Sequence, residues 1–170
     1  MNTLVSHKKR NEIIYDICKN AKGNVLVLFS RVDSHGKILF NESVTRFIDR
    51  KVLYISGETK MVDRAEVVET MEANDNVIAF CSFQTFGTGV SVNNIHHIIF
   101  AAPYKSRTKI LQAIGRGMRL KENSKSFSVY DIADDFRVDD FKNLSLVQYY
   151  KRKALYKEQE FNFGVTKIKL

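Results

Sequence analysis

A glutamine, a glycine and two arginines recur at fixed spacing within residues 104–119, YKSRTKILQAIGRGMR. Gln112, Gly115, Arg116 and Arg119 together form the pattern Q-x-x-G-R-x-x-R. Two guanidinium groups three residues apart can converge on one anion, and the forked geometry of arginine suits a phosphate. The alternative is a solvated basic helix end, which the helix dipole would favour. The accompanying glutamine and glycine, with strands predicted on either side, favour the phosphate-binding interpretation.

A second candidate segment, residues 82–92, has the sequence SFQTFGTGVSV. Gly87 and Gly89 would let the backbone approach a ligand closely. Hydroxyl groups are supplied by Ser82, Thr85, Thr88 and Ser91. Main-chain amides in a loop of this kind can hold phosphate. The alternative is a tight turn between a strand and a helix, and the residues alone leave both interpretations open.

Several chemistries are excluded because their motifs are missing. Val92 stands where a dinucleotide-binding loop would need a third glycine, so a nicotinamide enzyme is not expected. No G-x-x-x-x-G-K-[ST] sequence occurs, so the loop that cradles a triphosphate is missing. The two cysteines and four histidines show no metal-ligand spacing. We expect no metal site in the acidic cluster either, which we interpret as helix-terminal and solvated charge and which consists of Asp131, Asp134, Asp135, Asp139 and Asp140.

The composition is that of one globular domain with a polyanionic partner. The chain has 170 residues, of which 44% are hydrophobic and 27% charged, and a formal net charge of +8. Cys18 and Cys81 are interpreted as buried free thiols of a reducing compartment. No apolar run has the length of a membrane span and the first residues do not resemble a signal peptide, so we expect a cytoplasmic protein without a membrane partner.

Apolar segments of strand length alternate with segments of helical periodicity along most of the chain. Strands are predicted at residues 25–30, 52–56, 76–82, 96–102 and 126–133. Helices are predicted at residues 7–22, 37–49, 60–73 and 106–118, while 135–160 is expected to be mostly helical and 161–170 strand-like or frayed. The alternation predicts an α/β fold with a mainly parallel central sheet of five or six strands and helices on both faces.

We expect one domain at residues 1–137 and a helical basic extension, residues 138–170, packed on the same domain. In open α/β sheets, function collects at the carboxyl ends of the strands. The polar segments that follow the predicted strands are therefore the candidates, namely residues 30–36, 56–60, 82–91 and 103–107.

The order of these segments resembles the second RecA-like domain of superfamily 2 helicases. Five segments are similar to the stretches of that domain in chain order: VLVLFS at 25–30 (motif IV), ISGET at 55–59 with Arg64 downstream, SFQTFGTGVSV at 82–92 (motif V), QAIGRGMR at 112–119 (motif VI) and the closing strand SVYDIADDF at 128–136. Motif VI is the most specific part of the resemblance, which covers residues 20–137.

The resemblance implies one half of an ATP site that is shared between two RecA-like domains. The first domain, which these residues do not contain, would supply the Walker loop and bind most of the ATP with its Mg²⁺. Arg116 and Arg119 would be arginine fingers that reach the γ-phosphate, and Gln112 would help orient Arg116 or couple to the cleft between the two domains. The loop positions next to the nucleotide would be Gly87, Thr88, Gly89 and Gly115. Ser91 stands where many relatives carry an acidic residue, so a contact to the ribose is not implied.

The nucleic-acid contacts that the resemblance implies follow the first three strands, at Ser30, Arg31, Gly57, Thr59, Arg64 and Thr85. Independently, residues 151–170 interleave cations with aromatic side chains, a pattern that suits phosphate contact plus base stacking. Lys151, Arg152 and Lys153 are the cations predicted to bind nucleic acid there. The alternative is that the aromatic residues pack the last helix onto the domain while the charges solvate it.

The sequence thus predicts the C-terminal half of an ATP-dependent helicase or translocase of the DNA branch-migration, fork-remodelling or R-loop unwinding type, inactive by itself. Its partners would be the N-terminal RecA-like domain of the same protein and DNA, with RNA or an RNA–DNA hybrid as the alternative substrate. Two rival interpretations are a RecA-like module that binds nucleic acid without hydrolysing ATP and a small α/β nucleotide-binding enzyme of unrelated type.

Overall fold

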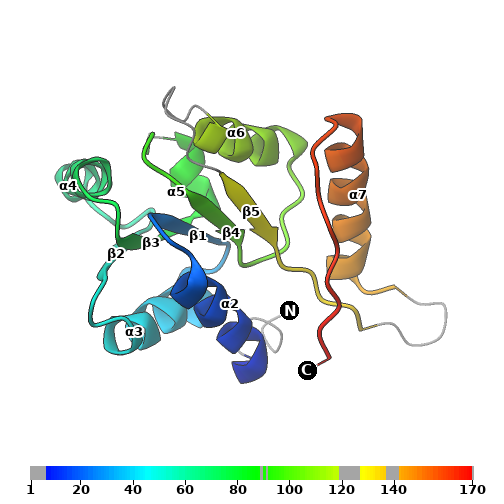
Figure 1. Cartoon of the computed structure of the whole chain (residues 1–170), viewed down its shortest axis with the longest axis horizontal. Helices are drawn as coiled ribbons and strands as arrows, with labels where there is room; N and C mark the ends of the chain where they lie inside the picture. The colour runs from blue at the N-terminus through cyan, green and yellow to red at the C-terminus, as the bar shows by residue number, and fades with distance from the viewer. Residues whose placement is uncertain (1–6, 89, 91, 119–126, 137–141, 170) are drawn as a thin grey trace.

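A computed structural model describes residues 7–88, 90, 92–118, 127–136 and 142–169 (Figure 1). The elements are α2 (Lys8–Asn20), β1 (Val25–Phe29), the π-helical turn η1 (Val32–Gly36), α3 (Lys37–Arg46), β2 (Lys51–Ile55), α4 (Met61–Ala73), β3 (Val77–Ser82), α5 (Phe83–Thr88), β4 (His97–Phe100), α6 (Arg107–Met118), β5 (Ser128–Asp131) and α7 (Leu144–Glu158).

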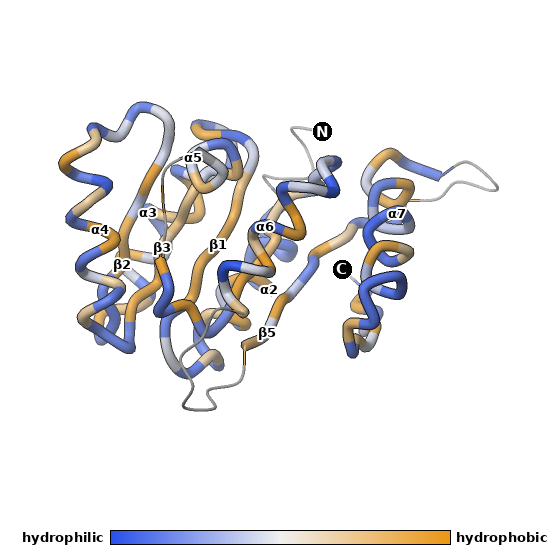
Figure 2. Tube along the Cα trace, turned by 90° about the horizontal axis from the view of Figure 1, so that it is seen from above, coloured by the Kyte–Doolittle hydropathy of each residue, from blue (hydrophilic) through white to orange (hydrophobic). Residues whose placement is uncertain are grey.

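The strands form one sheet of five parallel strands in the order β2-β3-β1-β4-β5. The predicted α/β fold with a parallel sheet is therefore confirmed. Helices α2 and α3 cover one face and α4, α5 and α6 the other, while α7 lies beside the β5 edge (Figure 1). Seen from above, α7 and α4 lie at opposite ends of the molecule (Figure 2).

Every residue of β1 and β3 is buried, which explains why both strands are continuous apolar runs without alternation. Two core clusters lie on the two faces of the sheet. Leu155 and Tyr156 of α7 belong to the larger cluster, together with residues of α4, α5 and α6. Figure 2 shows the apolar residues concentrated in these central strands.

Two segments that were expected to be irregular contain helical turns. The stretch after β1 forms η1 and continues directly into α3, with Gly36 at the junction. A side chain at Gly36 would place its Cβ 2.4 Å from the Phe29 ring, so only glycine lets the turn lie against β1. The stretch after β3 forms α5, because Ser82 Oγ accepts a hydrogen bond from the Thr85 amide at 3.1 Å and so caps the first turn.

The helical prediction for 135–160 is met by α7 alone, which begins after Asn143; residues 137–141 lie outside the described part of the chain. Residues 161–169 follow without regular secondary structure. None of the helices that the structure describes is long and apolar enough to cross a membrane.

Asn24 joins several elements at the amino-terminal edge of the sheet. Its fully buried side-chain amide donates to the carbonyl oxygens of Met71, Asn74 and Asn94, at 2.8, 2.6 and 2.8 Å. Its Oδ1 accepts from the Val77 amide at 2.9 Å. One side chain therefore fixes the start of β1 against α4, β3 and the segment before β4.

His35 in η1 is fully buried, and neither ring nitrogen has a hydrogen-bond partner among the described residues. Burial, with a smaller contribution from the charge of Arg10, lowers the pKa of His35 from its usual 6.5 to about 3. The folded chain therefore keeps this imidazole neutral at pH values at which the unfolded chain protonates it.

We expect His35 to make the folded state less stable in acid. Below pH 6.5 the unfolded chain takes up a proton at His35 that the folded chain accepts only near pH 3. The free energy of unfolding is therefore unaffected by this proton above pH 6.5 and decreases as the pH falls toward 3. At pH 5 the loss is about 2 kcal/mol, since each pH unit corresponds to about 1.4 kcal/mol. Urea denaturation of the parent and of His35→Leu at pH 5 and pH 7 measures it; equal pH dependence in the two proteins would contradict the assignment.

Candidate functional site

The carboxyl ends of all five strands meet at one edge of the sheet because the strands are parallel. The loops that follow β1 and β2 present Ser30, Arg31 and Gly57 at this edge, and all three residues are exposed. These three predicted contact residues therefore lie on an accessible surface at the same edge of the sheet, with β3 between the two strands that precede them.

The loop after β2 is shaped by two residues that were also predicted to touch nucleic acid. Arg64 donates from Nε to the carbonyl oxygen of Thr59 at 2.8 Å and from Nη2 to that of Gly57 at 2.9 Å. Thr59 Oγ1 accepts a hydrogen bond from the Ser56 amide at 2.9 Å. Both side chains hold the loop in place, so Arg64 and Thr59 support the exposed backbone at Gly57.

Thr85 does not have the exposed position that was predicted for it. Its side chain is 2% exposed, and its hydroxyl lies 2.7 Å from the Ser82 hydroxyl inside the first turn of α5. Because the Thr85 hydroxyl is buried and already paired with Ser82, it is not available to a phosphate oxygen, so the prediction of a direct contact by Thr85 is wrong. The residue belongs to the cap of α5.

Arg116 projects from the last turn of α6 onto the segment that follows β3. Its Nη1 donates to the carbonyl oxygen of Phe86 at 2.7 Å and also to that of Val90. The guanidinium carbon lies 5.0 Å from the centre of the Phe86 ring, a cation–π contact. Arg116 thus joins the two segments that the sequence singled out, and all three of these partners are neutral groups.

The glycines near Arg116 differ in what their missing side chains allow. A Cβ on Gly115 would meet nothing within 4 Å, and one on Gly87 would make only ordinary contact with Lys109. By contrast, a Cβ on Gly117 would lie 2.0 Å from the Phe127 ring. Packing within the described residues therefore requires Gly117 and leaves the surface at Gly87 and Gly115 open.

Gln112 lies one turn before Arg116 on α6 and is exposed. Thr88 ends α5, and the placement of its side chain is not described. Arg119 and Gly89, the remaining predicted positions of this site, lie outside the described residues, as does Ser91. The pairing of Arg116 with Arg119 therefore stays a prediction.

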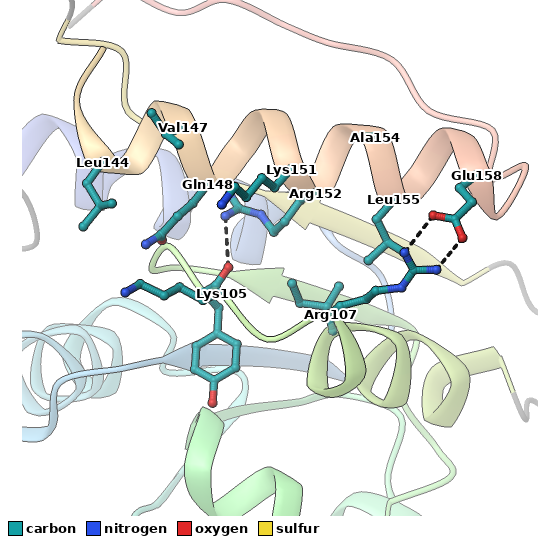
Figure 3. A pocket seen from close by; sticks show the side chains of 12 residues that line it. Lys105, Arg107, Leu144, Val147, Gln148, Lys151, Arg152, Ala154, Leu155 and Glu158 are labelled. Carbon is teal, nitrogen blue, oxygen red and sulfur yellow. Dashed lines mark hydrogen bonds and ion pairs between the residues drawn. The ribbon is translucent and has the colours of Figure 1, made fainter. Parts of the chain in front are cut away.

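The three cations predicted at the start of the basic tail lie in three different environments. Lys151 is exposed and lines a cleft between α7 and the connection from β4 to α6 (Figure 3). Lys153 lines a separate groove, beside β5 and residues 161–169. Arg152 is 3% exposed and faces the sheet.

Arg152 forms a buried ion pair and is not a surface cation, so its predicted role in binding nucleic acid is wrong. Its Nε and Nη2 donate to the two carboxylate oxygens of Asp131 at 2.7 and 2.8 Å, and Tyr156 donates its hydroxyl hydrogen to Asp131 at 2.9 Å. Burial alone would lower the pKa of Arg152, but the hydrogen bonds and charge of Asp131 raise it. A buried guanidinium needs such a partner, and this pair fastens α7 to the end of β5.

A second buried ion pair uses another aspartate of the acidic cluster. Arg10 of α2 donates from Nε to Asp134 Oδ1 at 2.7 Å and from Nη2 to the Ala101 carbonyl oxygen at 2.7 Å. Asp131 and Asp134 are therefore structural anions, whereas the sequence indicated solvated charges. Among the described residues, no group of three or more acidic, histidine and cysteine residues could hold a metal ion.

Lys105 is a surface cation that the sequence predictions did not include among the site residues. It is exposed in the connection after β4 and lines the same cleft as Lys151. The available signal was its position in the polar segment 103–107, directly after a predicted strand.

Comparison with known proteins matches residues 8–121 to the family described as the helicase conserved C-terminal domain. The chain is 38% identical over 112 residues to the ATP-dependent DNA helicase uvsW of Enterobacteria phage T4, covering 65% of this chain and 22% of that protein. It is 30% identical over 79 residues to the putative ATP-dependent helicase IRC3 of Saccharomyces cerevisiae, covering 46% of this chain and 11% of that protein. The chain thus spans about a fifth or less of these curated relatives.

Solved structures agree with this match. The crystal structure of T4 UvsW superposes with a TM-score of 0.72 at 30% identity, over 91% of this chain and 33% of that one. The C-terminal domain of the DEAD-box protein Dbp5 superposes with a TM-score of 0.65 at 9% identity, over 91% and 80% of the two chains, and so supports the fold alone. The family match includes both the segment at residues 82–92 and the segment at residues 104–119. This chain therefore belongs to the helicase conserved C-terminal domain family.

Proposed function

We propose that this chain is the C-terminal half of an ATP-dependent superfamily 2 DNA helicase or translocase of the branch-migration, fork-remodelling or R-loop unwinding type. The observation that carries the proposal is the position of Arg116. From the last turn of α6 it contacts the segment that follows β3, and the neighbouring Gly115 leaves an open surface beside it. Both relatives above are named as ATP-dependent helicases and the phage protein as a DNA helicase, which supports ATP as the nucleotide and DNA as the substrate. Recombination, repair and replication of DNA are the processes in which such an enzyme would act.

The ATP site would be shared with an N-terminal RecA-like domain of the same protein. The described residues offer arginine and open glycine surface for phosphate but no cluster of three or more acidic, histidine or cysteine residues for Mg²⁺; in this proposal that other domain holds the metal and most of the ATP. A bound triphosphate supplies the phosphoryl group that is transferred to water. Arg116, with Arg119, would then stabilise the negative charge that develops on the γ-phosphate.

The present contacts of Arg116 are compatible with such a role. Its described partners are two carbonyl oxygens and the Phe86 ring, so no carboxylate among them neutralises its charge. Hydrogen bonds from a guanidinium to phosphate are stronger than those to a neutral carbonyl, so an approaching γ-phosphate could replace them. Gln112 would orient Arg116, and Gly87, Thr88 and Gly89 would connect the nucleotide to the nucleic-acid loops.

Nucleic acid would cross the carboxyl edge of the sheet, at Ser30, Arg31 and Gly57, with Thr59 and Arg64 supporting the loop after β2. The net charge of +8 favours a polyanion, and DNA is the proposed substrate, with RNA or an RNA–DNA hybrid as the alternative. The domain would end near residue 137, with residues 138–170 as an extension packed on it.

We also propose a cytoplasmic location, which would be that of the host cell if a phage encodes the protein. Burial raises the pKa of both Cys18 and Cys81 to about 12, so both remain unreactive thiols.

Replacing the finger should slow chemistry without preventing ATP binding. In the complete enzyme, Arg116→Ala is expected to lower kcat by about 10³ or more, because one transition-state charge is no longer stabilised. Steady-state ATPase assays and a separate ATP-binding measurement check this. The matched control is Arg46→Ala, which removes an exposed arginine at the end of α3 that pairs with Glu12 of α2, and it should leave kcat unchanged. Turnover of Arg116→Ala within a few-fold of the parent would favour the alternative, a non-catalytic nucleic-acid-binding module.

The 170-residue chain alone should not hydrolyse ATP or unwind DNA, because it lacks a triphosphate-cradling loop. The measurement is phosphate release by the purified chain with and without single-stranded DNA. Turnover at ordinary enzyme rates, about 1 per second or faster, that persists through a second purification would refute the shared-site proposal.

A further inference from the structure

The cleft between α7 and the connection from β4 to α6, here called the α7 cleft, has a volume of about 440 Å³. This size is typical of pockets that bind small organic groups. It is lined from one side by residues 104–110 and from the other by α7 (Figure 3). Helix α7 lies outside residues 8–121, so one wall of the cleft is not part of the family match.

The two walls of the α7 cleft are joined at two places, one at the end of α7 and one near its middle. Arg107 and Glu158 form a bidentate ion pair at one end (Figure 3). Arg152, fixed by Asp131, donates to the Tyr104 carbonyl oxygen at 3.4 Å on the sheet side. The cleft is therefore a formed feature of the fold.

Gln148 has an unused hydrogen-bond acceptor at this cleft. The residue is 5% exposed, and its Oε1 accepts no hydrogen bond from any described residue. Figure 3 shows its amide extending from α7 toward the connection that carries Lys105. Buried polar atoms are nearly always paired, so this acceptor is available to a ligand that brings an N–H donor into the cleft.

The remaining lining combines cations with apolar groups. Lys105 and Lys151 are exposed, and neither forms an ion pair with another described residue. The apolar lining consists of Ile110, Leu144, Val147, Ala154 and Leu155. Cations suit a phosphate, the apolar groups suit a flat ring, and the free acceptor suits a ring N–H or amino group. Nucleotides carry all three features, since every common base has at least one N–H donor.

We propose that the α7 cleft binds one nucleotide of a nucleic-acid strand. The phosphate contacts Lys105 and Lys151, the base lies against Leu144 and Val147, and the base donates a hydrogen bond to Gln148 Oε1. This inference rests on the proposed function, to which it adds a contact outside the family's matched segment.

The position of the cleft allows one strand to reach both surfaces. Strand β4 is the neighbour of β1, and adjacent strands are about 4.8 Å apart. Lys105 follows β4 and Arg31 follows β1, so both lie at the same edge of the sheet. A strand held by the loops after β2 and β1 therefore continues into the α7 cleft within a few nucleotides.

The test begins with anisotropy of a labelled single-stranded oligonucleotide of about 12 nucleotides, titrated with the full chain at several salt concentrations. Lys105→Ala/Lys151→Ala is expected to weaken binding by about tenfold at low salt and to flatten the log–log salt slope by about 0.7, because the one phosphate that both lysines contact is no longer neutralised and each neutralised phosphate contributes about 0.7. Lys19→Ala/Lys22→Ala is the control: the charge change is the same, but the lysines lie around the end of α2, away from the cleft. Equal effects of the two pairs would overturn the proposal.

Gln148→Met removes the acceptor while keeping the charge and the approximate volume. It should weaken binding severalfold at an unchanged salt slope, and the difference should vanish on an oligonucleotide made of abasic sites. An equal loss on both oligonucleotides would mean that the substitution acts by disturbing α7, and would overturn the base contact.

Photocross-linking separates this inference from the proposed function. An oligonucleotide that contains 4-thiothymidine should label peptides from 104–110 or α7, as identified by mass spectrometry. Cross-links confined to peptides with Arg31 or Gly57 would overturn the cleft and leave the proposed function standing, whereas no cross-link anywhere would contradict both. If a free mononucleotide prevented cross-linking at the cleft as effectively, mole for mole, as an unlabelled oligonucleotide, the assignment of the cleft to a nucleic-acid strand would be overturned.

Discussion

The burial of β1 and β3 on both faces of the sheet is the constraint on which the rest of the structure depends. Polar side chains inside these strands would have no water, so the strands are apolar up to Ser82 at the end of β3, whose hydroxyl pairs with Thr85. Chemistry is therefore restricted to the strand ends and to the helices that cover the faces. This explains why the exposed candidates follow the strands, whereas Arg116 comes from a covering helix.

On the face of the sheet that α4, α5 and α6 cover, Arg116 connects the two candidate segments of the sequence, residues 82–92 and 104–119. Its guanidinium reaches across from α6 to the carbonyl oxygens of Phe86 and Val90, which follow β3. A ligand that drew Arg116 away would remove hydrogen bonds from the segment that leads back to β4. The loop after β3 also begins at the edge where nucleic acid is proposed to bind. Nucleotide and nucleic acid would thus act on one short stretch of backbone.

Two buried ion pairs fasten the sheet edge to helices from the two ends of the chain. Arg10 of α2 pairs with Asp134, and Arg152 of α7 pairs with Asp131. Such pairs are costly to desolvate, and removing one partner would leave an uncompensated buried charge. The Arg152 pair also sets the position of α7 against the connection after β4. The α7 cleft exists because this ion pair and the Arg107–Glu158 pair hold its walls.

The sequence by itself determined the fold class, the strands and most helices, because apolar periodicity reports directly on burial in a parallel sheet. It also located the segments around Gly87 and Arg116, whose residue types are unusual for a core. Only the tertiary structure decided which polar side chains are accessible. Arg152 and Lys151 are neighbours in the chain, yet helical geometry turns one toward Asp131 and the other toward the cleft. Thr85 and Gln148 are likewise buried, and the residue types alone did not reveal it.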